Sequence, residues 1–250
     1  MRLPPLTLLS VMKQRNDPDI NIQLRKQPFF QFLKVSLTDT VLSVAGDSEF
    51  MLGFGKRDVP ENVRKAGLSK WYDNLSEKDQ VKLKRYADKA DPSSASAFVM
   101  SVIYQAIEDH NYRFVASVYD SLEGVKLSEI ERFDINDAAI LGFYNAEEYD
   151  RCLELCDIGL DMLRKKEIFD HVMAKGTPDI PIPNDINCRN YKLNIVVGIH
   201  FDYDEGDKLL LQFQDMGLIT VEDVEYRRNG IKTFRLQRTF DNIFNVKEKE

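Results

Sequence analysis

Two stretches in the middle of the chain repeat the same pattern of apolar residues, and this repetition most restricts the possible folds. The segment from Ala97 matches the segment from Asp134, an offset of 37 residues. The matched pairs are Ile103 with Ile140, Tyr112 with Tyr149, Val115 with Cys152, Val118 with Leu155 and Leu122 with Gly159. A unit of this length made of two helices buries its apolar face only by packing on a neighbour. The repetition therefore predicts a stack of antiparallel helices from about Ser94 to Arg164.

A short polar break divides each copy into two helical stretches. The breaks are Asp109-His110-Asn111 in the first copy and Asn145-Ala146-Glu147 in the second. A tyrosine, Tyr112 or Tyr149, follows each break and opens the second stretch. We expect each copy to be a helical hairpin.

The second copy resembles a tetratricopeptide repeat over Ala138 to Leu160, AAILGFYNAEEYDRCLELCDIGL. The features that carry the resemblance are an aromatic at Phe143 or Tyr144, a turn at 145–148, Tyr149 at the start of the second helix, Cys152 where the family usually has Ala, and Gly159-Leu160 in the last turn. The offset differs from the family's usual repeat length by a few residues, and the closing proline is absent. The resemblance implies a helical-repeat fold that binds peptides or partner helices.

Three further helices are predicted on the N-terminal side of the repeats. Apolar residues spaced by three and four predict a helix over 27–45. Pro60 suits the first turn of a helix that continues to Leu75. Ser76 is placed as the N-cap of a helix that extends to Ala90 and buries one face. We expect the helices from Pro60 to Ala90 to cover the N-terminal end of the stack.

A proline-rich segment follows the repeats and predicts a boundary between modules. Three prolines, Pro178, Pro181 and Pro183, disfavour a regular helix and favour an extended linker. The predicted organisation is an N-terminal helical region at 1–57, a helical-repeat domain at 58–174, a linker at 175–186, a C-terminal module at 187–246 and a charged tail at 247–250.

The C-terminal module has mixed signals. Residues 193–200 are an apolar run that fits a buried strand or a buried helix, and periodicity does not decide between them. Residues 207–216 predict a helix that ends at Gly217. Asn229-Gly230 predicts a β-hairpin, in which a three-residue loop puts the apolar residues of both strands on one face. A helix followed by a hairpin resembles a winged-helix module, so the expected fold class is mainly α, with a helical-repeat stack followed by a small α+β module.

Basic residues cluster on the predicted hairpin and are the candidate contacts to nucleic acid or to a protein partner. They are Arg227, Arg228, Lys232, Arg235 and Arg238. The preceding segment, residues 202–218, which includes the predicted helix, carries five acids, Asp202, Asp204, Glu205, Asp207 and Asp215, against Lys208 alone. These acids would repel a phosphate backbone, so the charges favour protein docking over nucleic-acid binding.

Neither a catalytic group, a cofactor site nor a metal site is predicted. The three histidines, His110, His171 and His200, are scattered along the chain. Cys152 and Cys156 share a helical face and, with Cys188 and His200, suggest a zinc site, but the close paired spacing of structural zinc sites is missing. Buried cysteine behaves as a small apolar residue, so a place in the core is favoured.

Composition narrows the partners and the compartment. The formal net charge is −7, which gives no general attraction to nucleic acid or anionic membranes. Three cysteines in 250 residues favour a reducing, intracellular and hence cytoplasmic location. The apolar start, Met1 to Val11, is interrupted by two prolines and is interpreted as mature sequence, and the absence of a long apolar run predicts a soluble protein. The sequence thus predicts a non-enzymatic interaction or scaffold protein, with a nucleic-acid-binding regulator as the alternative.

Overall fold

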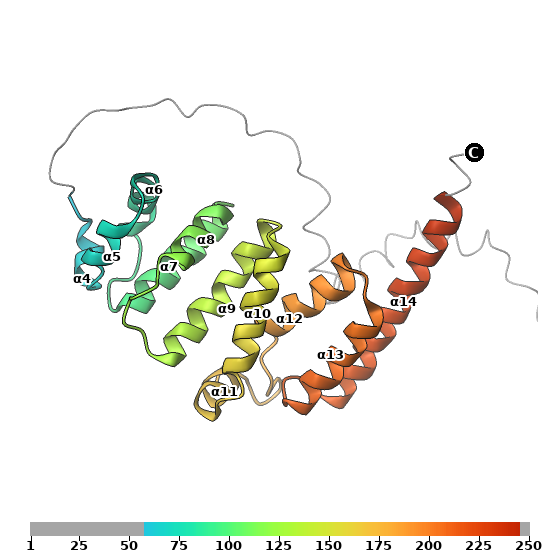
Figure 1. Cartoon of the computed structure of the whole chain (residues 1–250). Coiled ribbons are helices and arrows are strands. Elements are labelled where there is room, and N and C mark those ends of the chain that lie inside the picture. Colours follow the sequence, from blue (N-terminus) through green and yellow to red (C-terminus); the bar gives the residue numbers. More distant parts are fainter. Residues whose placement is uncertain (1–57, 246–250) are drawn as a thin grey trace, which may run out of the picture. The chain divides into compact units, whose positions relative to one another are not determined.

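The structure, a computed structural model, describes residues 58–245, and these form a mainly helical array (Figure 1). The helices are α4 (Glu61–Lys65), α5 (Ser69–Asn74), α6 (Glu77–Ala87), α7 (Ala95–Glu108), α8 (Tyr112–Asp120), α9 (Glu129–Asn145), α10 (Tyr149–Met162), α11 (Lys166–Met173), α12 (Asn187–Asn194), α13 (Tyr203–Asp215) and α14 (Val221–Asn245), with a π-helical turn η2 (Ile195–Ile199) between α12 and α13. No β-strand occurs between residues 58 and 245. The mainly helical class is confirmed, and the helix expected over 27–45 lies outside the described residues.

The two matched segments form two helical hairpins, α7–α8 and α9–α10, which lie side by side (Figure 1). Their turns have the same backbone geometry. His110 and Glu147, which are related by the offset of the sequence repeat, have φ angles of 56° and 61°. The following N–H groups donate back into the first helix, from Asn111 to Ala106 O at 2.8 Å and from Glu148 to Phe143 O at 3.0 Å. A left-handed residue closed by such a bond is a common helix end, so α7 and α9 end in the same way.

Helix α9 lies at the centre of the array and packs against α7, α8, α10 and α12. Gly142 allows the close approach of α8, because a Cβ atom built there would lie 2.5 Å from Val115 Cγ1. Phe133, Ile140 and Phe143 of α9 are buried in the core. This helix therefore fixes the positions of both hairpins.

The N-terminal helices partly match the sequence prediction. Ser76 caps α6 as expected, since its Oγ accepts the Asp79 N–H at 3.1 Å. The single helix predicted from Pro60 to Leu75 is instead two short helices, α4 and α5. Gly67 separates them in the left-handed region, at φ 74°, and the Leu68 N–H closes the end of α4 by donating to Val63 O at 3.0 Å. The apolar spacing continued through this break, which is why it was missed.

The proline-rich segment is a loop between α11 and α12 within one compact unit that contains all the described residues. Its C-terminal end is fixed to α9 by Asp137. The two carboxylate oxygens of Asp137 accept the N–H groups of Asn187 at 3.0 Å and Cys188 at 2.8 Å, at the start of α12. Helix α12 packs against both α9 and α10. The segment predicted as a linker therefore joins helices that share a core.

A buried arginine ties α12 to two loops. Arg189 donates from Nη1 to Leu218 O at 2.5 Å and from Nη2 to Asn184 O at 2.9 Å. Burial lowers its pKa to about 10, so the guanidinium stays charged at neutral pH. A buried cation is tolerated where carbonyl oxygens accept its hydrogen bonds. Through these bonds Arg189 fixes the loop ahead of α12 and the loop ahead of α14.

The C-terminal region differs most from the sequence prediction. The ambiguous run at 193–200 is helical, formed by the end of α12 and by η2. The β-hairpin predicted around Asn229-Gly230 is wrong, because residues 221–245 form the single helix α14. The small α+β module of winged-helix type expected at 187–246 is therefore not formed.

Capping at its start and the burial of apolar residues at a helical spacing explain why residues 221–245 form α14 and not a hairpin. Thr220 and Asp223 cap its start reciprocally, with the Asp223 N–H donating to Thr220 Oγ1 at 3.1 Å and the Thr220 N–H to Asp223 Oδ2 at 3.4 Å. Val224 and Ile231, seven residues apart, are buried on one face. Leu236, which the hairpin would have buried, is 60% exposed. Burial thus follows the helical period and not the alternation of a strand.

Candidate interaction surface on the C-terminal helices

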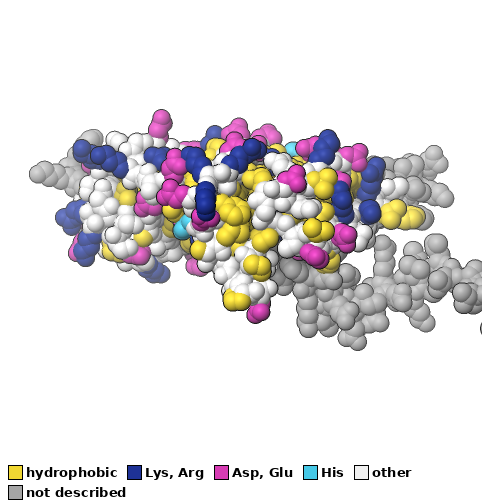
Figure 2. All heavy atoms as spheres, turned by 90° about the horizontal axis from the view of Figure 1, so that it is seen from below, with side chains coloured by type: hydrophobic (Ala, Val, Ile, Leu, Met, Phe, Trp, Pro, Cys, Tyr) yellow, Lys and Arg dark blue, Asp and Glu magenta, His cyan; other side chains and the backbone are white. Residues whose placement is uncertain are grey.

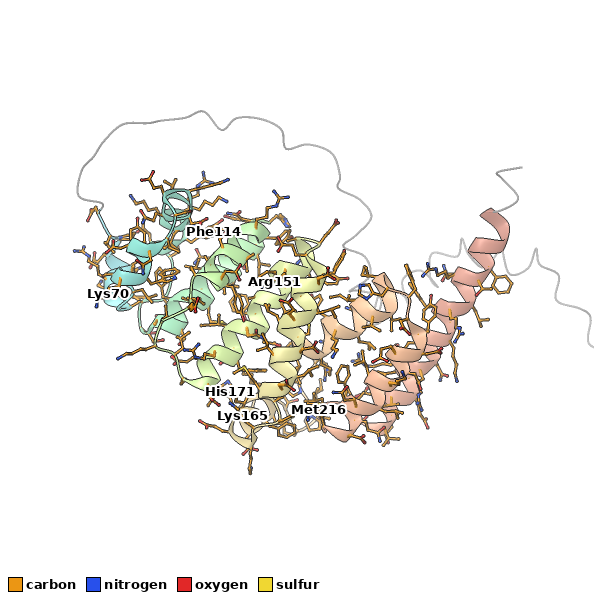
Figure 3. All side chains as sticks on the ribbon, in the orientation of Figure 1. Lys70, Phe114, Arg151, Lys165, His171 and Met216 are labelled. Atoms are coloured by element: carbon orange, nitrogen blue, oxygen red, sulfur yellow. The ribbon has the colours of Figure 1, made fainter. Side chains whose placement is uncertain are left out.

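Helices α13 and α14 pack against each other (Figure 1), and ion pairs join acids of α13 to arginines of α14. Asp202 caps α13 by accepting the Glu205 N–H at 2.9 Å, and Asp204 follows in the first turn. Met216, labelled in Figure 3, lies at the opposite end of α13. Two acids of α13, Asp204 and Asp207, lie within reach of arginines of α14.

Two of the five predicted contact residues form ion pairs with α13. Arg228 binds Asp207 through two hydrogen bonds, Nε to Oδ1 at 2.5 Å and Nη2 to Oδ2 at 2.7 Å. Arg235 Nη1 lies 3.3 Å from Asp204 Oδ1. Bidentate pairing orients a guanidinium as well as attracting it, so Arg228 fixes how the two helices lie along each other.

The other three basic residues lie in different surroundings. Arg227 is half-buried, and burial lowers its pKa. Lys232 is exposed on α14. The guanidinium of Arg238 stacks on the Phe201 ring, 3.1 Å from its centroid. The structure therefore does not bring the five cations together on one open surface.

The acidic helix was recognised in the sequence but assigned a different effect. The sequence predicts that these acids repel a phosphate backbone. In the structure, Asp204 and Asp207 balance the charge of Arg235 and Arg228. The opposite charges of the acidic segment that forms α13 and the basic segment that forms α14 are a signal in the sequence that these two segments pair.

The outward side of α14 exposes apolar side chains. Leu236 is 60% exposed and Phe240 57% exposed, one helical turn apart. Val221, at the start of the helix, is 54% exposed. In the space-filling view of Figure 2, exposed apolar side chains lie between charged ones on the face shown. Helix α14 thus has one side occupied by α13 and a second side with apolar groups in solvent.

An open cavity of about 350 Å³, nearer to a surface depression than to an enclosed pocket, lies at the beginning of α13 and is lined by His200, Phe201, Asp202, Tyr203, Asp204 and Arg235. Phe201 is in the left-handed region, at φ 58°, directly after η2 and His200. Among the described residues, two buried side-chain polar atoms lack a hydrogen-bond partner, the hydroxyl oxygen of Tyr203 and Nη1 of Arg238. Both side chains belong to this end of the α13–α14 pair.

The cysteines lie in the core of the array. Cys152, Cys156 and Cys188 are free thiols and are buried. A hydrogen bond with Cys152 and burial raise the pKa of Cys156, and burial raises that of Cys188. No cluster of three or more metal-binding side chains occurs in the part of the chain that the structure describes.

The histidines lie on separate elements. His171 of α11, labelled in Figure 3, lies with Nε2 3.0 Å from Asp134 of α9, and Lys175 also binds this carboxylate at 2.8 Å. His110 Nδ1 lies 2.6 Å from the Tyr112 hydroxyl oxygen. His200 lines the cavity. The structure therefore does not group the histidines.

The comparisons with known proteins found no matching family model, no matching curated protein and no matching solved structure. Within residues 58–245, no helix is both long enough and apolar enough to span a bilayer. The fold itself defines a mainly helical protein built from packed hairpins.

Proposed function

We propose that this chain is a non-enzymatic interaction protein that docks a protein partner through its helical hairpins and its C-terminal helices. The observation that carries the proposal is the second apolar side of α14. A surface helix in a globular protein usually buries one apolar stripe and presents polar residues elsewhere. Here α13 already occupies one side, and Leu236 and Phe240 remain exposed on another.

The expected partner is a protein segment with an apolar stripe, such as an amphipathic helix. Leu236 and Phe240 are spaced by four residues, which matches the spacing at which a partner helix presents its own contacts. The resemblance of Ala138 to Leu160 to a tetratricopeptide repeat supports the same kind of partner. Stacked helical repeats also need a polar outer face at their ends, and an apolar end helix accepts a neighbour.

No observation favours the nucleic-acid alternative. The predicted hairpin that would have presented the cations is a helix. Arg228 and Arg235 pair with aspartates, and Arg238 stacks on Phe201.

The test is affinity capture of the tagged full chain from its own host, followed by a direct binding measurement with each captured protein. The variant Leu236→Asp with Phe240→Asp places charge on the apolar side of α14. The matched control, Gln237→Asp with Thr239→Asp, adds the same charge at exposed polar positions of the same helix. We expect the wild type and the control to bind the same partner with equal affinity, and the apolar-side variant to lose it.

Two results would contradict the proposal. One is that the captured proteins bind the apolar-side variant as tightly as the wild type. The other is that nothing is enriched over the tag alone. Circular dichroism of both variants should match the wild type, because all four positions are exposed.

A further inference from the structure

Helix α14 extends beyond the helix that supports it (Figure 1). It has 25 residues against 13 in α13, which corresponds to about 37 Å against about 20 Å of helix. The two helices run antiparallel, since Asp207 pairs with Arg228 and Asp204, nearer the start of α13, pairs with Arg235. Phe240 therefore lies beyond the start of α13. Most helices in proteins are stabilised by packing on another element, so this end of α14 suits a second long helix.

The exposed side of α14 has the spacing of a helix that pairs with another helix. Tyr226, Leu236 and Phe240 are 48%, 60% and 57% exposed. Asn229 and Thr233 are also exposed and complete the series 226, 229, 233, 236 and 240. Steps of three and four residues in alternation are the pattern of a coiled-coil seam, and polar residues within such a seam lower its stability. A reversible helix pair is therefore expected on this side.

Charged residues are divided along α14. The first six residues of the helix carry three acids and no base, and residues 232–238 carry three bases and no acid. Glu222, Glu225 and Lys232 are exposed, and no ion pair within residues 58–245 includes them. A parallel second copy would bring like charges together, whereas an antiparallel copy brings the acidic start of each helix to the basic stretch of the other. The charges thus match a second copy in antiparallel orientation.

A second copy also makes the most of the few apolar residues on this side. Across a two-fold axis every contact occurs twice, so each exposed residue contributes two times to the same interface. Antiparallel pairing places Leu236 and Phe240, in the second half of each helix, against the first half of the other. Val221 and Tyr226 are exposed in that first half, at 54% and 48%. Apolar side chains are thus available at both ends of the contact.

We propose that a second copy of this chain binds the exposed side of α14, with the two helices antiparallel across a two-fold axis. This inference rests on the proposed function, because it names the partner that the same surface binds. The acidic start of each α14 lies along the basic stretch of the other. Leu236 and Phe240 of both copies become buried in the contact.

The experiment is sedimentation velocity of the purified full chain over a series of concentrations. We expect a reversible monomer–dimer equilibrium. Leu236→Asp with Phe240→Asp should weaken it by at least about a hundredfold, since each substitution acts twice in the dimer. The control, Val81→Asp with Ile158→Asp, places the same charges on two exposed apolar residues of α6 and α10 and should dimerise as the wild type does. Circular dichroism should show equal helix content in all three chains.

Reversal of charge tests the orientation of the two helices. Glu222→Lys with Glu225→Lys should weaken dimerisation by about tenfold at low ionic strength, and Lys232→Glu by about fivefold. An equimolar mixture of these two variants should regain the wild-type affinity, because both ends of the mixed dimer are then attractive. A parallel pair predicts instead that neither variant alone is weaker than the wild type, because like charges already meet in it.

The results separate this inference from the proposed function. A full chain that stays monomeric up to about 0.5 mM would overturn the inference. A dimer that tolerates Leu236→Asp with Phe240→Asp, or charge variants that dimerise as the wild type does, would overturn it as well. A monomeric chain that captures a different protein through Leu236 and Phe240 retains the proposed function and assigns the surface to that partner. Absence of both the dimer and a captured protein would contradict the inference and the proposed function together.

Discussion

Replacement of Gly230 by alanine distinguishes the helix α14 from the hairpin that the local sequence suggests. Gly230 lies in the interior of α14 and is not among the glycines with positive φ. Glycine in a helix interior costs about 0.5–1 kcal/mol relative to alanine. Gly230→Ala should therefore stabilise α14 by about 0.5–1 kcal/mol. A hairpin with Gly230 in a left-handed position predicts the opposite sign, because alanine would be strained there.

Gly217 offers a matched control with the opposite expectation. It follows α13 at φ 70°, and the next N–H, of Leu218, donates to Phe213 O at 2.8 Å. The nearest atom to an added Cβ would be Phe169 Cζ at 3.5 Å, an ordinary contact. The backbone alone therefore sets the effect, and Gly217→Ala should destabilise by about 1–2 kcal/mol.

The assay is hydrogen exchange of the full chain, followed by mass spectrometry of peptides from α13 and α14. A stabilisation of about 1 kcal/mol slows exchange through local opening about fivefold, and Gly230→Ala should slow α14 by about twofold to fivefold. Gly217→Ala should accelerate exchange in both helices. Faster exchange of residues 221–245 in Gly230→Ala, together with lower helical ellipticity, would contradict the helix and support the hairpin.

Three further predictions concern the helical hairpins. The pKa of Asp137 is raised by burial, so the folded chain keeps this proton to higher pH than the unfolded chain. The free energy of unfolding should accordingly fall as pH rises from 3.8 through the folded-state pKa, and urea titrations of Asp137→Asn should lack that part of the slope. Glu147→Gly should raise the urea midpoint by relieving the left-handed backbone, worth about 1 kcal/mol, whereas Glu147→Ala should not. Gly142→Ala should destabilise by about 1–3 kcal/mol through overpacking on Val115, and the double variant with Val115→Ala should recover part of the loss in the same titration.

The helical hairpins could be predicted because their signals are local and repeated. The polar breaks place His110 and Glu147 at the turns, and the structure has both in the left-handed region. Ser76 was recognised as a cap because its partner is only three residues away. Features determined within one or two helical turns are therefore accessible from a single sequence.

The C-terminal helices could not be predicted in the same way because competing local signals pointed to different structures. Asn229-Gly230 is a strong turn signal, yet it lies inside α14. The reciprocal capping of Thr220 and Asp223 was a helix signal that we missed. The pairing of Arg228 with Asp207, 21 residues away, then supports the helix through tertiary contacts.

The candidate site was only partly visible in the sequence. Arg238 was singled out for its charge, but its position on the ring of Phe201 depends on how α13 and α14 pack. Nothing in the residue type of Phe201 indicates a left-handed backbone, since this region is dominated by glycine and asparagine. The conformation results from the hydrogen bonds that close η2, which only the structure shows.

The small apolar area that Leu236 and Phe240 expose limits the binding free energy that α14 alone can provide. Complete burial of a leucine or phenylalanine contributes about 1.5–3 kcal/mol, and Leu236 and Phe240 are already partly buried, at 60% and 57% exposed. Association costs at least about 4 kcal/mol in lost translational and rotational freedom. These two residues alone therefore cannot hold a stable partner. A partner that binds α14 must therefore also contact other surface of the chain, and α13 is the helix that packs beside α14. The loss of binding expected for the charged variant thus reports removal of an anchor within a larger interface.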